Sequence, residues 1–223
     1  LLSGDGIQTV KHPSIITALR VTEGQNKIKN CMAYKDGFVE IQDASSQASV
    51  IDLPRDSNLK ILDYCCGSGG KSLALDAWTE GKIFAYDISP DRSFNLKTRA
   101  ERSNAQITKI SKPIKEMFDV IFCDVPCSGS GSWRRDPDGK WKLNAHSWQN
   151  LLNTQIEVLN EAKELLKTDG ILIYATCSVL LSENYKQLEK FCSINPEFEI
   201  EKAHQFLPSD LGDGFFYGFL KKK

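Results

Sequence analysis

The feature that most constrains the fold of this chain is the alternation of short apolar runs with longer amphipathic segments from residue 60 onward. The expected strands are 61–64, 82–87, 106–110, 118–124 and 171–175, followed by two terminal strands at 197–201 and 214–220. The expected helices are 71–79, 90–103, a long one from Trp148 that Gly170 ends, and 182–192. Strands that alternate with helices form parallel sheets through crossover connections. The sequence therefore predicts an α/β fold with a doubly wound, mainly parallel sheet and an antiparallel C-terminal strand.

The composition is that of an ordinary globular domain. The 223 residues are enough for one domain, and 28 basic against 29 acidic side chains give a net charge of −1. This balance excludes a histone-like polycation and an acidic disordered tail. We see no apolar run long enough to span a membrane and no signal peptide, so we expect a cytoplasmic protein without membrane contact. The first residue is not Met, and we expect part of the native N-terminus to be missing.

The chain has seven cysteines, an odd number. Without a secretion signal, an odd count favours reduced thiols over a disulfide framework. The adjacent Cys65 and Cys66 lack the spacing of a zinc site, and the three histidines lie far apart. We therefore expect no metal.

Residues 1–58 are weakly patterned, with a possible strand at 38–42 and a turn at 54–58. We interpret them as an N-terminal extension or the remnant of a small domain, and assign 59–223 to the main domain.

In doubly wound sheets the ligand lies beyond the carboxyl ends of the strands, so the loops after the strands are the first candidates for a site. The first such loop runs from Asp63 to Ser72, and its Gly70-Lys71-Ser72 ending is typical of a phosphate-binding loop. That motif also needs a glycine where Cys65 stands. An acidic residue followed by Gly-x-Gly, which lets the backbone approach an adenosyl cofactor, fits better. The candidate cofactor residues of this loop are Cys65, Cys66, Gly67, Ser68, Gly69, Gly70 and Lys71.

Asp87 ends the second strand, where a carboxylate can accept hydrogen bonds from the ribose hydroxyls of a nucleoside cofactor. The alternative is that Asp87 provides a negative charge at the start of a helix near Pro90, and both roles can coexist. Because the full dinucleotide pattern is absent, S-adenosylmethionine is the preferred cofactor.

Two thiols and a carboxylate follow later strands. Asp124-Val125-Pro126-Cys127 ends the fourth strand, and Thr176-Cys177-Ser178 ends the fifth. This combination suits methylation of cytosine at carbon 5, a weak nucleophile until a thiolate adds to carbon 6. A helix starting near Ser182 would lower the pKa of the Cys177 thiol through its dipole. Spacing alone does not choose between the two thiols.

Three segments carry a family resemblance: Asp124–Asp138, Thr176-Cys177-Ser178 with Glu183-Asn184, and Asp213–Phe216. They resemble the NOP/Sun (Fmu-type) family of RNA cytosine-5 methyltransferases, and in particular its bacterial ribosomal RNA members. The likeness begins near Glu40, in Glu40–Gln47, and continues to the C-terminus. It implies a class I, Rossmann-like methyltransferase domain at 59–223 and an RNA substrate, with ribosomal RNA preferred over transfer RNA.

The resemblance also implies a role for each site residue. Cys177 is the nucleophile, Cys127 assists release of the methylated RNA, and Asp124 hydrogen-bonds the ring nitrogen and amine of the cytosine and lies near the cofactor. The loop from Cys65 to Lys71 cradles S-adenosylmethionine, with Asp87 on its ribose and Arg92 nearby.

The sequence departs from the family in two places. Cys66, Gly67 and Ser68 replace the usual Ala-Ala-Pro of the first loop, and we expect cofactor binding to survive this change. The carboxylate that the family places after the third strand, to hold the adenine amine, is absent between Ile107 and Pro113. Another side chain or a backbone carbonyl must replace it.

Basic residues suggest where RNA binds. Arg134, Arg135, Lys140 and Lys142 lie beside the proposed site, interleaved with Trp133 and Trp141, a combination suited to phosphate contact and base stacking. A second basic stretch, 92–115, carries seven basic residues and one acid, and is either RNA-binding or a solvated helix face.

Three alternatives remain open at this point: a methyltransferase for exocyclic amines, a non-catalytic RNA-binding module, and a phosphate-binding-loop NTPase. The first normally needs an aromatic residue where Cys127 stands. Intact thiols oppose the second, whereas the missing adenine carboxylate favours it. We expect a monomer.

Overall fold

The computed structural model describes residues 1–223 and contains a seven-stranded sheet and a separate two-stranded one. The strands of the large sheet follow the order β5-β4-β3-β6-β7-β9-β8. Their bounds are β3 Lys60–Asp63, β4 Lys82–Ala85, β5 Ile107–Lys109, β6 Phe118–Asp124, β7 Leu166–Thr176, β8 Phe198–Phe206 and β9 Phe215–Lys222. Strands β3 to β7 are parallel, and β9 is antiparallel to both β7 and β8. The predicted doubly wound sheet with an antiparallel C-terminal strand is confirmed.

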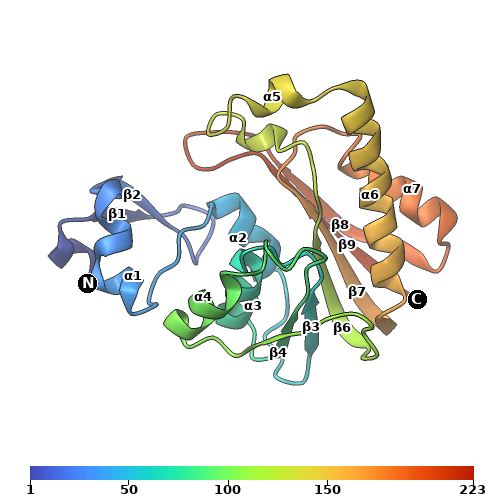
Figure 1. Ribbon diagram of the computed structural model, residues 1–223, viewed down its shortest axis with the longest axis horizontal. Coiled ribbons are helices and arrows are strands. Elements are labelled where there is room, and N and C mark those ends of the chain that lie inside the picture. The colour runs from blue at the N-terminus through green and yellow to red at the C-terminus, as the bar shows by residue number, and fades with distance from the viewer.

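Helices cover both faces of this sheet (Figure 1). The bounds are α2 Ala44–Ile51, α3 Gly70–Trp78 and α4 Leu96–Ser103 on one face, and α6 Ala145–Lys163 and α7 Tyr185–Ile194 on the other. Successive residues of β3 point into the two layers: Ile61 joins the core beneath α2 and α3, and Leu62 joins the core beneath α6 and α7. Both are fully buried, as expected for a parallel strand covered on both sides.

Several predicted elements differ from the observed ones. Helix α4 begins at Leu96 rather than at Pro90, because residues 90–95 form turns. Helix α6 ends at Lys163, and Gly170 lies inside β7, because the apolar period of the helix runs directly into the next strand. The segment 38–42 is extended but pairs with no strand.

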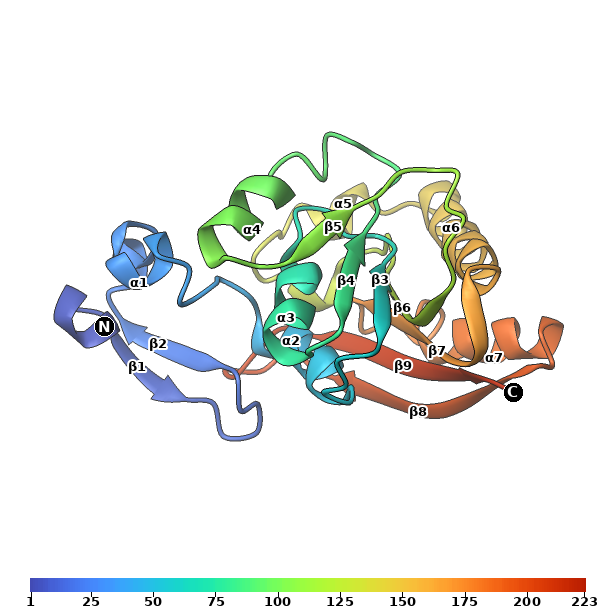
Figure 2. The same cartoon turned by 90° about the horizontal axis from the view of Figure 1, so that it is seen from below.

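The N-terminal residues form a small unit beside α3 and α4 (Figure 2). Its elements are η1 Leu2–Asp5, β1 Gln8–Lys11, β2 Leu19–Glu23, η2 Gln25–Asn30 and α1 Met32–Lys35. Strands β1 and β2 form an antiparallel hairpin, and Ile7, Cys31 and Ala33 form a small core. By contrast, Val50 of α2 packs in the same core as Ile61 of the large sheet. The boundary after residue 58 stays a prediction.

No helix of this chain has both the length and the apolar character that crossing a bilayer requires.

Candidate active site at the carboxyl ends of the strands

The predicted site residues meet at one edge of the large sheet because they follow parallel, neighbouring strands. Asp63 ends β3, Asp124 ends β6 and Thr176 ends β7. Asp124 lies beside Ala175 in the ladder between β6 and β7, and the backbone N–H of Val125 donates to the Ala175 carbonyl at 3.0 Å. The two segments that carry the thiols therefore leave the sheet side by side.

The two thiols are in contact: the Sγ atoms of Cys127 and Cys177 are 3.3 Å apart. A hydrogen bond from Cys127 lowers the pKa of Cys177 below its ordinary value, and Lys71 lowers it further, while burial and Asp124 oppose them. The same hydrogen bond, together with burial, raises the pKa of Cys127 well above its ordinary value. The sequence predicted that the dipole of a helix starting near Ser182 would lower the pKa of Cys177. Helix α7 begins at Tyr185 instead, three residues later. The largest cause of the lowered pKa is the hydrogen bond from Cys127. The pair is thus arranged so that Cys177 is the more readily ionised thiol and Cys127 the more strongly protonated one.

Lys71, in the first turn of α3, brings a positive charge near Cys177. Its Nζ donates to Oδ2 of Asp124 at 2.9 Å and to Oγ of Ser46 in α2 at 2.5 Å. The ammonium also lies 4.6 Å from the centre of the Phe215 ring. The Lys71 side chain is only 7% exposed, so this charge is held in place by its neighbours.

Glu183 fixes the turn that carries Cys127. Its carboxylate is fully buried and accepts three hydrogen bonds: from the Ser128 backbone N–H at 2.8 Å, from the Ser128 hydroxyl at 2.6 Å and from the Gln155 amide at 3.1 Å. A buried carboxylate is tolerated only when its oxygens are satisfied in this way. Glu183 therefore ties α6 and the Cys127 turn together.

Asn184 does the same for the turn that carries Cys177. Its Oδ1 accepts from the Thr176 hydroxyl at 2.6 Å, and its Nδ2 donates to the Ser178 carbonyl at 2.9 Å. The N–H of Gly131 donates to the Cys177 carbonyl at 2.9 Å, so the two turns are also joined directly. A Cβ atom on Gly131 would lie 2.0 Å from the carbonyl oxygen of Gly214. Glycine is therefore required where these segments cross.

The first loop is closed by Asp87. One of its oxygens accepts from the Gly67 N–H at 2.9 Å, and the other accepts from the Ser89 N–H at 2.8 Å and lies 3.3 Å from Arg92. Asp87 does not stand at the start of a helix, since α4 begins at Leu96. Gly67 has a φ of +48°, and a Cβ atom there would meet nothing within 4 Å, so the backbone at this point is open to a ligand.

Asp63 is the most unusual titratable group of the site. It is fully buried, and burial raises its pKa to about 7. Its Oδ2 accepts from the Ser72 hydroxyl at 2.6 Å, whereas its Oδ1 has no hydrogen-bond partner. A buried carboxylate oxygen without a partner is costly, and such atoms are often completed by a ligand.

Cys65 and Cys66 stand next to Asp63 in the chain, but their thiols are not activated. Burial raises the pKa of Cys65 and raises that of Cys66 to about 12. Both thiols are therefore neutral at physiological pH, and neither shares the lowered pKa of Cys177.

No carboxylate lies between Ile107 and Pro113 in the sequence, but Glu161 of α6 reaches Lys112 in this segment. Glu161 accepts from Lys112 at 2.5 Å and from the Tyr64 hydroxyl at 2.6 Å. The rings of Tyr64 and Tyr86 lie 5.0 Å apart beside this pair. Glu161 is thus engaged by Lys112 and Tyr64.

Two of the four predicted RNA contacts are bound within the protein. Arg134 and Arg135 each donate through Nε to Asp213 at 2.6 Å, one to each carboxylate oxygen. Lys140 and Lys142 lie on the short helix α5, Gly139–Lys142, at the top of Figure 1, and both are exposed. Between them Trp141 is 79% exposed, with the Lys140 ammonium 4.8 Å from its ring centre.

The basic stretch 92–115 is not simply a solvated face. Arg99 and Arg102 both pair with Glu40 of the segment that precedes α2, and Arg99 also donates to the Ser68 carbonyl at 2.8 Å. They hold the N-terminal segment against α4 and the first loop.

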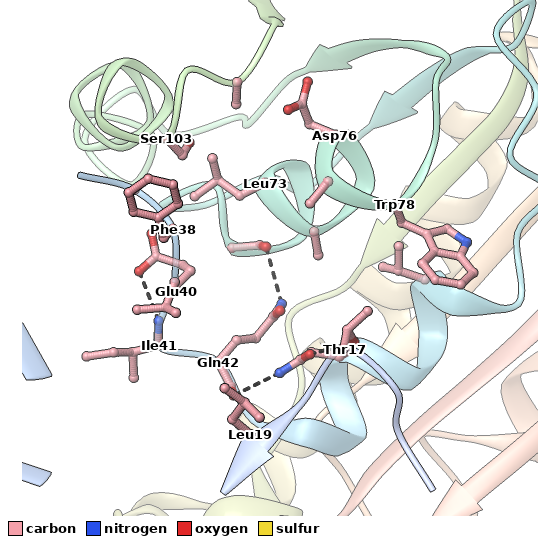
Figure 3. Close-up of a pocket in the computed structure, with 18 of the residues that line it drawn as sticks. Thr17, Leu19, Phe38, Glu40, Ile41, Gln42, Leu73, Asp76, Trp78 and Ser103 are labelled. Carbon is pink, nitrogen blue, oxygen red and sulfur yellow. Dashed lines mark hydrogen bonds between the residues drawn. The ribbon is translucent and has the colours of Figure 1, made fainter. Parts of the chain in front are cut away.

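A separate cavity of about 520 Å³ lies between the N-terminal hairpin and α2–α3 (Figure 3). Apolar side chains such as Leu19, Phe38 and Leu73 line much of it. Gln42 extends across one wall and donates to the Gly70 carbonyl at 3.2 Å. Neither thiol and neither Asp124 nor Lys71 lines this cavity.

Sequence reasoning gave no role to three residues at the site: Ser46, Asp63 and Asp213. Asp213 binds both arginines, and its carbonyl accepts from Ser45 of α2 at 2.9 Å. Ser46 and Asp213 lie inside the segments that carried the resemblance, but Lys71, which donates to Ser46, is 25 residues away in the chain, and Arg134, which donates to Asp213, is 79 residues away. Nothing local in the sequence predicts these contacts.

Comparison with known protein families identifies the family to which this chain belongs. A family model described as 16S rRNA methyltransferase RsmB/F matches residues 50–221. The chain belongs to this family. Ribosomal RNA small subunit methyltransferase B of Proteus mirabilis is 33% identical over 233 residues, which cover all of this chain and 55% of the relative. The protein of the same name from Klebsiella pneumoniae is 33% identical over 240 residues and is covered to 56%. This RsmB/F family member thus spans about half the length of the curated relatives it matches.

Solved structures agree with this assignment. The crystal structure of PH0851 superposes with a TM-score of 0.91 at 27% identity, over 99% of this chain and 55% of that protein. The structure of NSun6 from Pyrococcus horikoshii with SFG gives a TM-score of 0.78 at 21% identity, over 92% of this chain and 59% of that one. At that identity the second likeness establishes the shared fold. The resemblance to the NOP/Sun family and the expected class I methyltransferase fold are confirmed.

Proposed function

We propose that this chain is the catalytic part of an S-adenosylmethionine-dependent enzyme that methylates carbon 5 of a cytosine in ribosomal RNA, with Cys177 as the nucleophile. The observation that carries the proposal is the contact between the two thiols next to the Lys71–Asp124 ion pair. Family membership and relatives named for ribosomal RNA methylation support the substrate class.

The two thiols would have different roles, Cys177 as the nucleophile and Cys127 in its release. Cys177, with its lowered pKa, would add as a thiolate to carbon 6 of the cytosine, which makes carbon 5 nucleophilic. Asp124 would accept a hydrogen bond from the exocyclic amine of the base, and Lys71 would hold that carboxylate in place. Carbon 5 would then take the methyl group, a base would remove the proton from carbon 5, and the bond between carbon 6 and the Cys177 sulfur would break to restore the ring. Cys127, a neutral thiol 3.3 Å away, would stabilise the leaving thiolate.

S-adenosylmethionine fits the residues present, and it would supply an electrophilic methyl group on a sulfonium. The open backbone at Gly67, and with it the loop from Cys65 to Lys71, would approach it. Asp63 has an unpaired, buried oxygen that suits an amine donor. Asp87, already bonded to Gly67, would contact the ribose, with Arg92 beside it. The SFG in the P. horikoshii NSun6 structure, an analogue of this cofactor, supports the choice.

RNA would bind to the surface formed by α5 and the loop that precedes it. Lys140 and Lys142 are exposed for phosphate contact, and Trp141, beside Lys140, offers an exposed ring on which a base could stack. Arg134 and Arg135 would contribute mainly by fixing this loop to Asp213, with their exposed edges open to phosphate.

The test is incubation with 5-fluorocytosine-containing RNA and S-adenosylmethionine, followed by denaturing electrophoresis and peptide mapping. The fluorine blocks loss of the carbon 5 substituent, so the enzyme should remain attached to RNA through Cys177. Cys177→Ala should give no adduct, whereas Cys127→Ala should still form one and, on ordinary RNA, release product slowly.

An adduct on Cys127 would overturn the assignment of the nucleophile. Cofactor binding by calorimetry without any adduct would contradict the proposed reaction for this chain on its own. Failure to bind the cofactor would favour an RNA-binding module without activity.

A further inference from the structure

Helix α2 contacts the Lys71 ammonium of the active site through the side chain of Ser46. Its Oγ accepts a hydrogen bond from the Lys71 ammonium at 2.5 Å, on an ammonium that also donates to Asp124 at 2.9 Å. A lysine ammonium on a flexible stem has three donors and no preferred direction of its own. Its position is therefore set by the acceptors around it, and Ser46 is one of the two side chains that supply them.

The Ser46 hydroxyl is also contacted by Gln42, on the preceding segment. Nε2 of Gln42 approaches its Oγ at 3.5 Å and donates to the Gly70 carbonyl at 3.2 Å, in the wall of the cavity between the N-terminal hairpin and α2–α3 (Figure 3). The first turn of α2 is fixed as well, because Asp43 accepts from the Ser45 N–H at 2.9 Å and from the Asp213 N–H at 3.0 Å. The serine hydroxyl is thus presented to Lys71 from a rigid helix end.

Opposing charges surround the Cys177 thiol. The titratable and charged groups that face it are Cys127 on the turn after β6, Asp124 at the end of β6 and Lys71 on α3. Lys71 favours the thiolate and Asp124 disfavours it. The balance depends on where the ammonium lies between them, since electrostatic interaction falls with distance.

We propose that Ser46 is a positioning residue that holds the Lys71 ammonium within reach of both Asp124 and Cys177, so that one charge neutralises the carboxylate and supports the thiolate. The proposal rests on the proposed function in taking Cys177 as the nucleophile. Ser46 touches neither thiol and acts through Lys71.

The test measures thiol reactivity, which needs neither RNA nor cofactor. Iodoacetamide reacts with thiolates, and peptide mapping follows alkylation of Cys177 as a function of pH. The matched pair is Ser46→Thr, which keeps the hydroxyl, and Ser46→Val, which replaces it with a methyl group of similar size. Ser49→Ala is the control in the same helix, since the Ser49 hydroxyl donates to the Ser46 carbonyl at 2.7 Å and has no contact with Lys71.

Ser46→Val should raise the pH midpoint of Cys177 alkylation by about half a unit to one unit, which slows alkylation at pH 7 by about 3- to 10-fold. Ser46→Thr and Ser49→Ala should match the unchanged protein. Where methylation is measured, Ser46→Val should lower kcat and leave the KM for RNA within about twofold.

Equal midpoints for the Thr and Val variants, both folded by their melting curves, would overturn the proposal. If Ser46→Val does not fold, the Thr variant still decides, because a changed midpoint there with the hydroxyl present would also overturn it. A chain without methyltransferase activity but with the expected midpoints would refute the proposed function and leave the role of Ser46 intact.

Discussion

The unpaired carboxylate of Asp63 should make the stability of the protein depend on pH in an unusual direction. Burial raises its pKa from 3.8 to about 7. The folded protein therefore keeps a proton on Asp63 between pH 4 and 7, while the unfolded chain has lost it. Stability is highest below about pH 4 with respect to this group, falls as the pH rises through that window, and levels off above pH 7.

The magnitude follows from the shift. One pKa unit corresponds to about 1.4 kcal/mol, so the rise from about pH 5 to about pH 8 removes roughly 3 kcal/mol of stability. Asp63→Asn abolishes the titration and keeps an oxygen that can accept from the Ser72 hydroxyl. The added amide N–H₂ has no acceptor and costs about 1–3 kcal/mol at every pH. The difference in unfolding free energy between the variant and the unchanged protein should therefore move by roughly 3 kcal/mol in favour of the variant between pH 5 and 8.

Urea unfolding at pH 5, 6, 7 and 8 measures this difference directly. Asp91→Asn, at an exposed aspartate, controls for the loss of a negative charge. A difference between the Asp63→Asn variant and the unchanged protein that stays constant across these pH values would refute the reasoning. Calorimetry should also find weaker binding of S-adenosylmethionine to the variant, because the oxygen offered to the cofactor is lost.

Three further substitutions have defined outcomes. Glu183→Gln replaces one of the two accepting oxygens with an N–H₂ donor that faces the backbone N–H and hydroxyl donors of Ser128. The variant should lose about 2–3 kcal/mol of unfolding free energy in urea titrations. An unchanged unfolding midpoint would contradict this expectation. Gly131→Ala should cost about 2 kcal/mol or more in thermal melts, because the new methyl group meets the Gly214 carbonyl, and a melting temperature equal to that of the parent would argue against the close crossing. Asp213→Asn weakens the two arginine contacts and should speed tryptic cleavage in the loop before α5, whereas an unaltered cleavage pattern would mean that the loop is held by other contacts.

Much of the fold follows from the sequence because its strands are buried on both faces. The run 118–124 is apolar except for Asp119 and ends in the carboxylate of Asp124, and it is β6 with the predicted bounds. The failures occur where one pattern serves two elements. Leu165 and Leu166 continue the apolar period of α6, but Leu165 accepts from the Phe118 N–H and Leu166 begins β7.

The sequence predicted the site residues that directly follow strands, but it did not predict the contacts between distant segments. Cys127, Cys177 and Asp124 stand at strand ends, and the parallel sheet brings them together. Whether they play their predicted roles stays a prediction. The contact between Ser46 and Lys71 could not be predicted, because it depends on how α2 packs against α3. Side-chain packing between distant segments leaves no periodic signal in the sequence.

The order of strands also bears on how the protein is made. Strand β9 lies between β7 and β8 although it follows both in the sequence. During synthesis β8 has no sheet to join until β9 has emerged from the ribosome and inserted beside β7. Asp213, which precedes β9 by two residues, reaches Asp43 and the two arginines only at that stage. A nascent chain halted before residue 213 would carry both thiols but would lack the contacts of Asp213 with Asp43 and the two arginines, and its unpaired strands would be prone to aggregation.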